Sequence, residues 1–160
     1  MKVEQVMNRN VKTCLANDTL NRAAQLMWEN DCGCVPVVDD DGRTVGMITD
    51  RDVCMAAYTQ GGMLSHLRVG SAMAREVRSC RPMDTVAEAE SIMRAAQVRR
   101  LPVVDAERHI VGLLSLNDIA REVARERGAS GKPELGTEEV AETLGAICIP
   151  REHRELSVAA

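Results

Sequence analysis

An internal repeat constrains the fold of this chain more than any other feature of its sequence. When the chain is shifted by 66 residues, 15 of the 46 positions from 7 to 52 match their partners without a gap. Unrelated sequences of ordinary composition would share about three of them. The longest match pairs Pro-Val-Val-Asp at 36–39 with the same four residues at 102–105. The chain therefore contains two similar structural units.

Each copy predicts the order β-α-β-β-α. A short extended run around Val11 or Val77 comes first, and a threonine suited to an N-cap then begins the first helix. VPVVD and LPVVD predict apolar strands with proline at the first position, where no ladder donor is needed. TVGMIT and IVGLLS predict the strands that follow. A second helix begins at Thr49 in one copy and at Ser115 in the other, where it runs to Arg127.

The repeat also predicts the domain organisation. Units of about 60 residues bury so little surface that each would be only marginally stable alone. We therefore expect an α+β fold in which the two repeats pack sheet to sheet. A Gly/Pro/Ser-rich linker precedes one more helix, with Val140, Leu144 and Ile147 on one face, which would pack across a dimer or against a partner. The predicted segments are the first repeat with its connecting loop at 1–66, the second repeat at 67–127, the linker at 128–136, and the C-terminal helix and tail at 137–160.

Charge, aromatic content and the lengths of the apolar runs argue against several function classes. Acidic residues outnumber Lys and Arg by 24 to 20, and Trp28 and Tyr58 are the only aromatic side chains, so nucleic-acid binding is not expected. No run approaches the roughly 20 apolar residues of a membrane span. The first residues show no apolar core of a secretion signal. We expect a cytoplasmic protein.

Two short segments carry the chemistry that both copies retain. GMITDRD and GLLSLND each end a buried strand and open a helix, with Thr49 and Asp52 in one copy and Ser115 and Asp118 in the other. A helix N-terminus attracts phosphate, and a carboxylate one turn later can accept two hydrogen bonds from a ribose. The same spacing is also typical of a capping box, which simply closes the start of a helix. Both interpretations remain open from the motif alone.

The repeated segments resemble a tandem pair of cystathionine-β-synthase-type (CBS) domains, in a stand-alone module of the bacterial type. The residues that carry the resemblance are VKTCLANDTL and CGCVPVVDDDGRTVGMITDRDV, with their partners VRSCRPMDTV and VRRLPVVDAERHIVGLLSLNDI. The resemblance covers residues 1 to about 125. It implies two clefts related by a pseudo-twofold axis, which bind AMP, ADP, ATP or S-adenosylmethionine as a regulatory ligand. It also implies a homodimer and a target protein that this sequence does not identify.

Site residues follow from this resemblance by position. The ribose would be bound by Asp52 and Asp118, the phosphate side would face Thr49 and Ser115, and Arg51 would lie in the first cleft. Backbone amides of four short segments would line the base: Thr13-Cys14 and Cys34-Val35 in the first cleft, Ser79-Cys80 and Arg100-Leu101 in the second.

The two clefts are expected to differ in charge. Four arginines flank the segments of the second cleft. A guanidinium group can donate two hydrogen bonds at once to the oxygens of a phosphate. We therefore expect the second cleft to accept a polyphosphate and the first to prefer fewer phosphates. A solvated basic surface or a docking face for an acidic partner would explain the same residues: Arg78, Arg81, Arg99 and Arg100.

The cysteines offer an alternative function. If Cys14, Cys32 and Cys34 lie together beside the first cleft, they could bind zinc or form a disulfide in a redox- or metal-responsive sensor. Cys54 and Cys148 are interpreted as core residues on helix faces. A structural interaction module that binds no ligand is a further alternative. No catalytic constellation is legible, so neither an enzyme nor a required cofactor or metal is expected.

Overall fold

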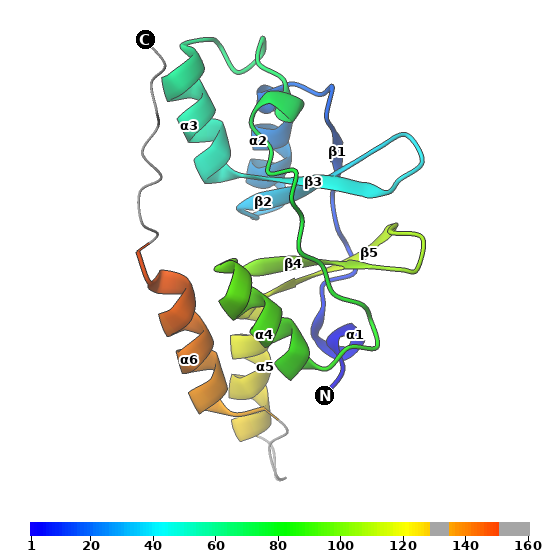
Figure 1. Ribbon diagram of the computed structural model, residues 1–160, viewed down its shortest axis with the longest axis vertical. Helices are drawn as coiled ribbons and strands as arrows, with labels where there is room; N and C mark the ends of the chain where they lie inside the picture. The colour runs from blue at the N-terminus through cyan, green and yellow to red at the C-terminus, as the bar shows by residue number, and fades with distance from the viewer. Residues whose placement is uncertain (129–134, 151–160) are drawn as a thin grey trace.

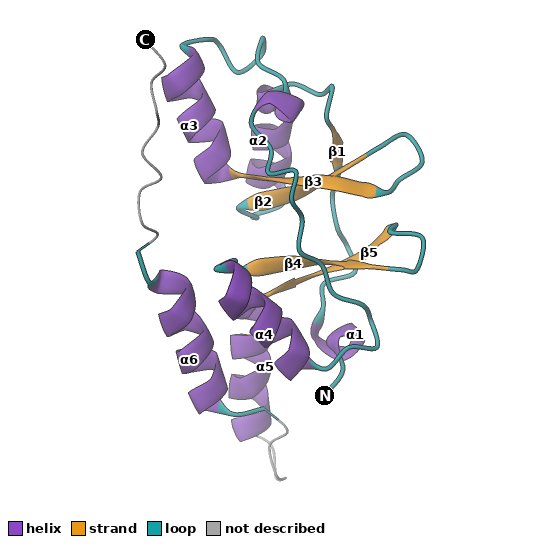
Figure 2. Ribbon diagram, viewed as in Figure 1, coloured by secondary structure: helices purple, strands orange, loops and turns teal. Residues whose placement is uncertain are grey.

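The computed structural model describes residues 1–128 and 135–150 of the chain. The strands lie in the middle of the molecule, where the sheet of one repeat faces the sheet of the other, and the helices lie outside them (Figure 1 and Figure 2). The predicted α+β architecture, with two packed repeats and a C-terminal helix, is confirmed. No helix within the described residues is long and apolar enough to cross a membrane.

Apart from the first strand, the elements follow the predicted order in both repeats. The first repeat contains β1 (Cys14–Leu15), α2 (Leu20–Glu29), β2 (Cys34–Val38), β3 (Thr44–Thr49) and α3 (Asp50–Gln60). The second contains α4 (Val86–Ala96), β4 (Arg100–Val104), β5 (Ile110–Ser115) and α5 (Leu116–Arg127). Three more helices lie outside this pattern: α1 (Val3–Val6), the short 3₁₀ helix η1 (Val69–Ser71) and α6 (Thr137–Cys148).

The first strand of each repeat differs from its prediction. The expected runs around Val11 and Val77 lie before the paired residues, because β1 begins only at Cys14 and pairs in parallel with β2. In the second repeat this strand is reduced to one bridge between Cys80 and Val103. The other two strands pair antiparallel in both repeats.

The prediction that Pro36 and Pro102 begin their strands is wrong. Each is the third residue of its strand, in β2 and β4. The carbonyl of Pro102 accepts the N–H of Cys80 at 3.1 Å, so this edge of β4 faces the short first strand. Because the first strand pairs over so few residues, the edge tolerates a residue that has no N–H.

Two segments cross from one repeat to the core of the other. Val3 and Met7, which precede the strands of the first repeat, are buried in the core of the second. Val69 and Met73, the equivalent residues 66 positions later, are buried in the core of the first. A Cβ atom at Gly46 would collide with Met73, and one at Gly112 with Met7. The repeated glycines therefore admit the crossing segments.

Helix α6 packs on its own chain. Of the predicted apolar face, Val140 and Ile147 pack against the second core, but Leu144 is 46% exposed, and Thr143 is the fully buried residue of the helix. The expected packing across a dimer or against a partner is wrong for this face, because it lies against α4 and α5. Residues 129–134 of the predicted linker and 151–160 of the predicted tail lie outside the described residues.

Candidate functional site

The paired hydroxyl and carboxylate residues form the starts of α3 and α5. The Oδ2 atom of Asp52 accepts hydrogen bonds from the N–H of Thr49 at 2.9 Å and from its hydroxyl at 2.7 Å. Asp118 accepts the same two bonds from Ser115, at 2.8 and 2.5 Å. Both pairs are therefore capping boxes, and both aspartates remain partly exposed. Each capping box uses one carboxylate oxygen, so capping leaves the Oδ1 atom for another partner.

Strand register brings the predicted base-lining residues beside these helix starts. Cys34 pairs with Thr49 across β2 and β3, and Arg100 pairs with Ser115 across β4 and β5. Val35, one residue later, is fully buried in the first core. Leu101 is equally buried in the second core, so both residues can offer only backbone groups to a ligand. Three further predicted residues lie nearby in sequence: Thr13 before β1, Ser79 before the bridge at Cys80, and Arg51 exposed on the first turn of α3.

The two helix starts differ in one contact that the motif does not reveal. Arg121 donates to Oδ1 of Asp118 and covers the second carboxylate oxygen. The equivalent position in the first repeat is Met55, and the contacts described for Asp52 end on Oδ2. A comparison of the two repeats three residues beyond each aspartate would have found this difference in the sequence.

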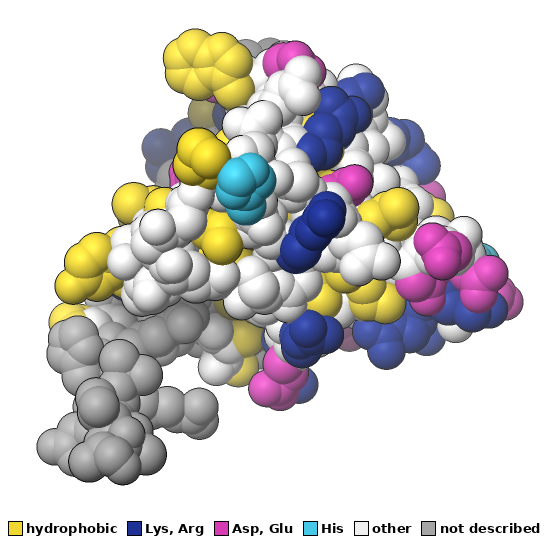
Figure 3. Space-filling view, turned by 90° about the horizontal axis from the view of Figure 1, so that it is seen from above, with side chains coloured by type: hydrophobic (Ala, Val, Ile, Leu, Met, Phe, Trp, Pro, Cys, Tyr) yellow, Lys and Arg dark blue, Asp and Glu magenta, His cyan; other side chains and the backbone are white. Residues whose placement is uncertain are grey.

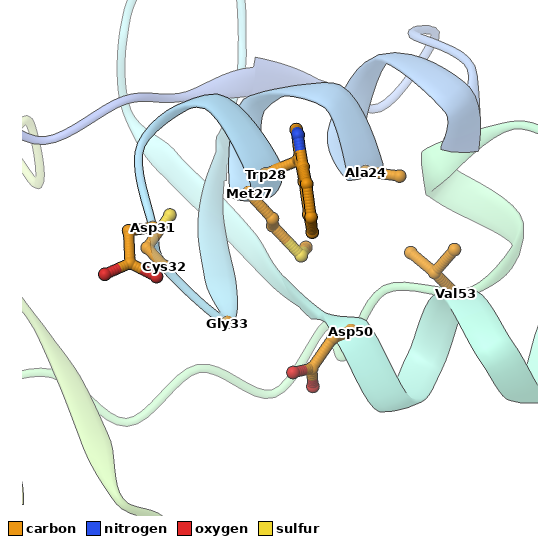
Figure 4. A pocket seen from close by; sticks show the side chains of 8 residues that line it. All are labelled: Ala24, Met27, Trp28, Asp31, Cys32, Gly33, Asp50 and Val53. Carbon is orange, nitrogen blue, oxygen red and sulfur yellow. The ribbon is translucent and has the colours of Figure 1, made fainter.

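One surface cavity lies between α2 and the start of α3. Its volume is about 420 Å³. Trp28 and Met27 stand in its middle, with Asp31 on one side and Ala24 and Val53 on the other (Figure 4). No residue predicted to bind the ligand in the first cleft lines this cavity. Three of the residues that do line it are close in sequence to predicted ones: Cys32 and Gly33 precede Cys34, and Asp50 lies between Thr49 and Arg51. The sequence signal that was missed is Trp28, the only tryptophan, at a position where the second repeat has arginine.

A second cavity of about 440 Å³ lies beside the bridge at Cys80. Ser79 lines it, as does Arg81, one of the four arginines assigned to the second cleft. Asp118 and Ser115 do not line it, so the cavity coincides with only part of the predicted site. The remaining wall residues are Val77, Cys80, Asp84, Val104, Asp105 and Arg108.

The other three arginines do not gather at one point. Arg78 forms an ion pair with Glu76 at 2.7 Å. Arg99 donates to the sulfur of Cys148 at the end of α6. Arg100 reaches the first repeat, where its Nη2 atom would lie 3.3 Å from a Cβ at Gly33. A polyphosphate preference of the second cleft thus stays a prediction.

Cys14, Cys32 and Cys34 do not form a group of three close enough to hold a metal, and all three are free thiols. A redox role for them stays a prediction. Within residues 1–128 and 135–150, the one group of three close enough to hold a metal is Asp105, Glu107 and His109, on the exposed β4–β5 turn. Burial raises the pKa of the Cys14 thiol to about 12 and that of Cys34 to about 11, so both thiols are protonated at neutral pH.

The predicted burial of two other cysteines is wrong. Cys54 and Cys148 are exposed rather than buried in a core. Cys54 lies on the outer side of α3, and Cys148 is the last residue of α6.

Comparison with known proteins agrees with this geometry. The CBS domain family matches residues 3–58 and 69–125. The CBS domain-containing protein YhcV of Bacillus subtilis is 36% identical over 74% of this chain and 82% of its own length. The crystal structure of Hypoxic Response Protein I with two coordinated zinc ions is 31% identical, with a TM-score of 0.69 over 76% of this chain and 98% of that one.

A further solved structure is the CBS domain pair of protein MJ0100, in complex with 5′-methylthioadenosine and S-adenosyl-L-methionine. It is 26% identical to this chain, with a TM-score of 0.69, and the match covers 76% of this chain and 98% of that one. The family match spans both repeats, and the repeat order, the crossing segments and the duplicated helix starts are common to its two halves. The chain therefore belongs to the CBS domain family.

Proposed function

We propose that this chain is a cytoplasmic regulatory module that binds an adenosyl ligand between its two CBS repeats. The ligand class comprises AMP, ADP, ATP and S-adenosylmethionine. Asp52 and Asp118 bind the ribose, and Thr49 and Ser115 face the phosphate side. Backbone groups at Cys34-Val35 and Arg100-Leu101 line the base, with Thr13, Ser79 and Arg51 at the edges of the clefts. A target protein then responds to the ligand-bound arrangement of the repeats.

The observation that carries this proposal is the duplicated helix start. Thr49 with Asp52 and Ser115 with Asp118 occupy equivalent positions. The hydroxyl residue of each pair lies directly opposite the first residue of the neighbouring strand. A cap needs only one carboxylate oxygen, and the second can accept a ribose hydroxyl. The MJ0100 domain pair, which is in complex with two adenosyl compounds, supports this ligand class.

Ligand binding would act through the relative position of the repeats. The cores of the two repeats are separate, and they meet through their sheets and crossing segments. A ligand that contacts both repeats favours the arrangement in which both sets of contacts form. The output is then a shift in population, which needs no catalytic group.

Thermal-shift and calorimetric titrations with the four ligands test this proposal. Asp52→Ala and Asp118→Ala remove both a cap and a ribose contact. Glu88→Ala is the matched control, because Glu88 accepts the same pair of bonds from Thr85, at 2.7 and 2.8 Å, at the start of α4. Each variant should lose about 1 kcal/mol of stability with its cap.

Each aspartate variant should lose the response of its own cleft, whereas Glu88→Ala should keep the full response to ligand. At a hundredfold excess over Kd, a ligand adds about 2.7 kcal/mol, or several degrees in Tm. The proposal fails if no ligand shifts the wild-type protein, or if the shift is equal in all three variants. In that event the aspartates are helix caps alone.

A further inference from the structure

The wall of the cavity beside Cys80 differs from the equivalent part of the first repeat at two positions, and both carry arginine. Eight residues line this cavity of about 440 Å³. Sixty-six positions earlier, five of the eight are identical, and Thr13 takes the place of Ser79. The two that differ are Arg81, where the first repeat has leucine, and Arg108, where it has glycine. The repeated architecture therefore does not require the arginines.

Arg108 adopts a backbone conformation that favours glycine. Its φ is 72°, in the left-handed region, and Gly42 at the equivalent position has a φ of 80°. A residue with a Cβ atom is strained there, whereas glycine is not. Residues held in such conformations cluster at ligand sites. Because Gly42 forms the equivalent turn without strain, the turn alone does not explain an arginine at this position.

The Arg108 side chain is fixed by the first repeat. Its Nη2 atom donates to the carbonyl oxygen of Thr44 at 3.3 Å, and the Arg108 carbonyl accepts the N–H of Thr44 at 3.0 Å. A guanidinium has five N–H groups, and Thr44 takes one of them. The contact therefore positions the side chain and leaves donors for a ligand in the cavity.

Arg81 brings a second guanidinium to the same cavity. Within residues 1–128 and 135–150, no hydrogen bond or ion pair joins this guanidinium to another side chain or to the backbone. Its equivalent in the first repeat, Leu15, has no polar side-chain atom. The second repeat thus carries a set of donors beside the cavity for which the described parts of the chain supply no acceptor.

The two aspartates of the cavity bind backbone groups rather than the arginine side chains. Asp84 accepts the N–H of Arg81 at 2.7 Å. Asp105 accepts the N–H groups of Glu107 and His109, at 3.0 and 2.8 Å. The equivalent aspartates of the first repeat accept backbone N–H groups in the same way, at 2.8–3.1 Å. Because these bonds already compensate the carboxylates, the guanidinium groups remain for a ligand.

We propose that this cavity binds a small dianion, a phosphate or a dicarboxylate, between Arg81 and Arg108. Each guanidinium can donate two parallel hydrogen bonds to a phosphate or carboxylate group. The Ser79 hydroxyl, in the same wall, is a further donor. The volume of about 440 Å³ lies within the range of small-molecule sites.

This site is separate from the adenosyl sites of the proposed function. None of the four ribose and phosphate residues lines the cavity, and the two proposals share Ser79 and Cys80. The adenosyl sites lie at the start of β4, where Arg100 pairs with Ser115, whereas the cavity lies at the end of this strand, at Val104. A strand rises about 3.3 Å per residue, so the two ends are roughly 13 Å apart. The dianion site therefore does not depend on an adenosyl ligand.

The surroundings of the cavity are polar. Arg108 lies in the β4–β5 turn, and a bridge between Arg43 and His109 holds this turn against the β2–β3 turn (Figure 1). Seen from above, acidic and basic side chains gather together on the side to which these turns point, and most hydrophobic side chains lie on the opposite side (Figure 3). This side of the molecule therefore suits a charged ligand.

Calorimetric titration of the full chain with inorganic phosphate and with succinate tests the proposal, at an ionic strength held constant with sodium chloride. We expect saturable binding of at least one of these two probes. Arg81→Leu and Arg108→Gly install the residues of the first repeat, and each should weaken this binding about tenfold or more. Arg78→Ala is the control and should leave the affinity unchanged, because Arg78 pairs with Glu76 and does not line the cavity.

Both arginine variants are expected to fold, since the first repeat carries the same residues at the equivalent positions, and circular dichroism checks this. They should keep the wild-type response to AMP, whereas Asp52→Ala and Asp118→Ala should keep the binding of the anion. These results distinguish a failure of this site from a failure of the proposed function. A wild-type chain that binds neither probe overturns the proposal. So does an anion affinity that the arginine variants leave unchanged, or one that falls only in the aspartate variants, because the anion would then occupy the adenosyl clefts.

Discussion

At the residue scale, Asp52 and Asp118 make the same cap but have different surroundings. Arg121 occupies the second carboxylate oxygen of Asp118, whose side chain is only 12% exposed. A ribose hydroxyl that binds there must displace the guanidinium. The arginine itself is mostly exposed, so this ion pair contributes no more than about 1 kcal/mol. We therefore expect the first cleft to bind an adenosyl ligand more tightly than the second.

Arg121→Met, which copies Met55 of the first repeat, should raise the affinity of the second cleft up to about fivefold. Calorimetric titration with AMP on an Asp52→Ala background isolates that cleft. Arg125→Met is the control, because Arg125 forms a similar pair with Glu122 one turn further along the same helix. An equal gain in affinity with Arg125→Met would show that net charge, rather than the contact with Asp118, is responsible.

The residue pattern predicted the caps but not the surroundings of the cysteines. Hydroxyl and acidic residues three apart act on the backbone beside them, so their role depends on local sequence alone. Whether Cys54 and Cys148 are buried depends on which other helix covers their face. Sequence periodicity did not contain that information, because cysteine is compatible with either side of a helix.

At the element scale, α6 buries an acidic residue. Glu90 is almost fully buried, and burial, partly offset by Thr143 and Arg94, raises the pKa of its carboxyl above the ordinary 4.5. The folded protein therefore binds this proton more tightly than the unfolded chain does. The stabilisation is fully present below pH 4.5 and is lost as the pH rises through the raised pKa of the folded state.

Glu90→Gln should consequently raise the free energy of unfolding at pH 7, and the gain should disappear near pH 4. Urea denaturation at both pH values measures this difference. Glu142→Gln removes the same charge from an exposed position of α6 and serves as the control. A Glu90→Gln protein less stable than wild type at pH 7 would mean that the carboxylate is required by Arg94 and Thr143.

At the scale of the whole molecule, the repeat predicted two equivalent units but not the exchange between them. A shift of 66 residues aligns Met7 with Met73, yet it does not say to which core either methionine belongs. The structure places Met7, which precedes the strands of the first repeat, in the second core, and Met73, which precedes those of the second repeat, in the first core. Domain boundaries drawn from the alignment stay a prediction, whereas the contacts of the crossing segments can be tested directly.

The glycines facing the crossing segments provide that test. Gly46→Ala and Gly112→Ala should each destabilise the protein by about 1–3 kcal/mol, because the added methyl groups meet Met73 and Met7. Gly145→Ala is the control, since a Cβ in the middle of α6 meets nothing within 4 Å and should stabilise the helix by up to about 1 kcal/mol.

Urea denaturation of double variants then identifies the partners. Met7→Ala should relieve Gly112→Ala but not Gly46→Ala, and Met73→Ala should do the reverse. Equal relief by either methionine would contradict the exchange, because each segment would then act on general packing rather than on one core.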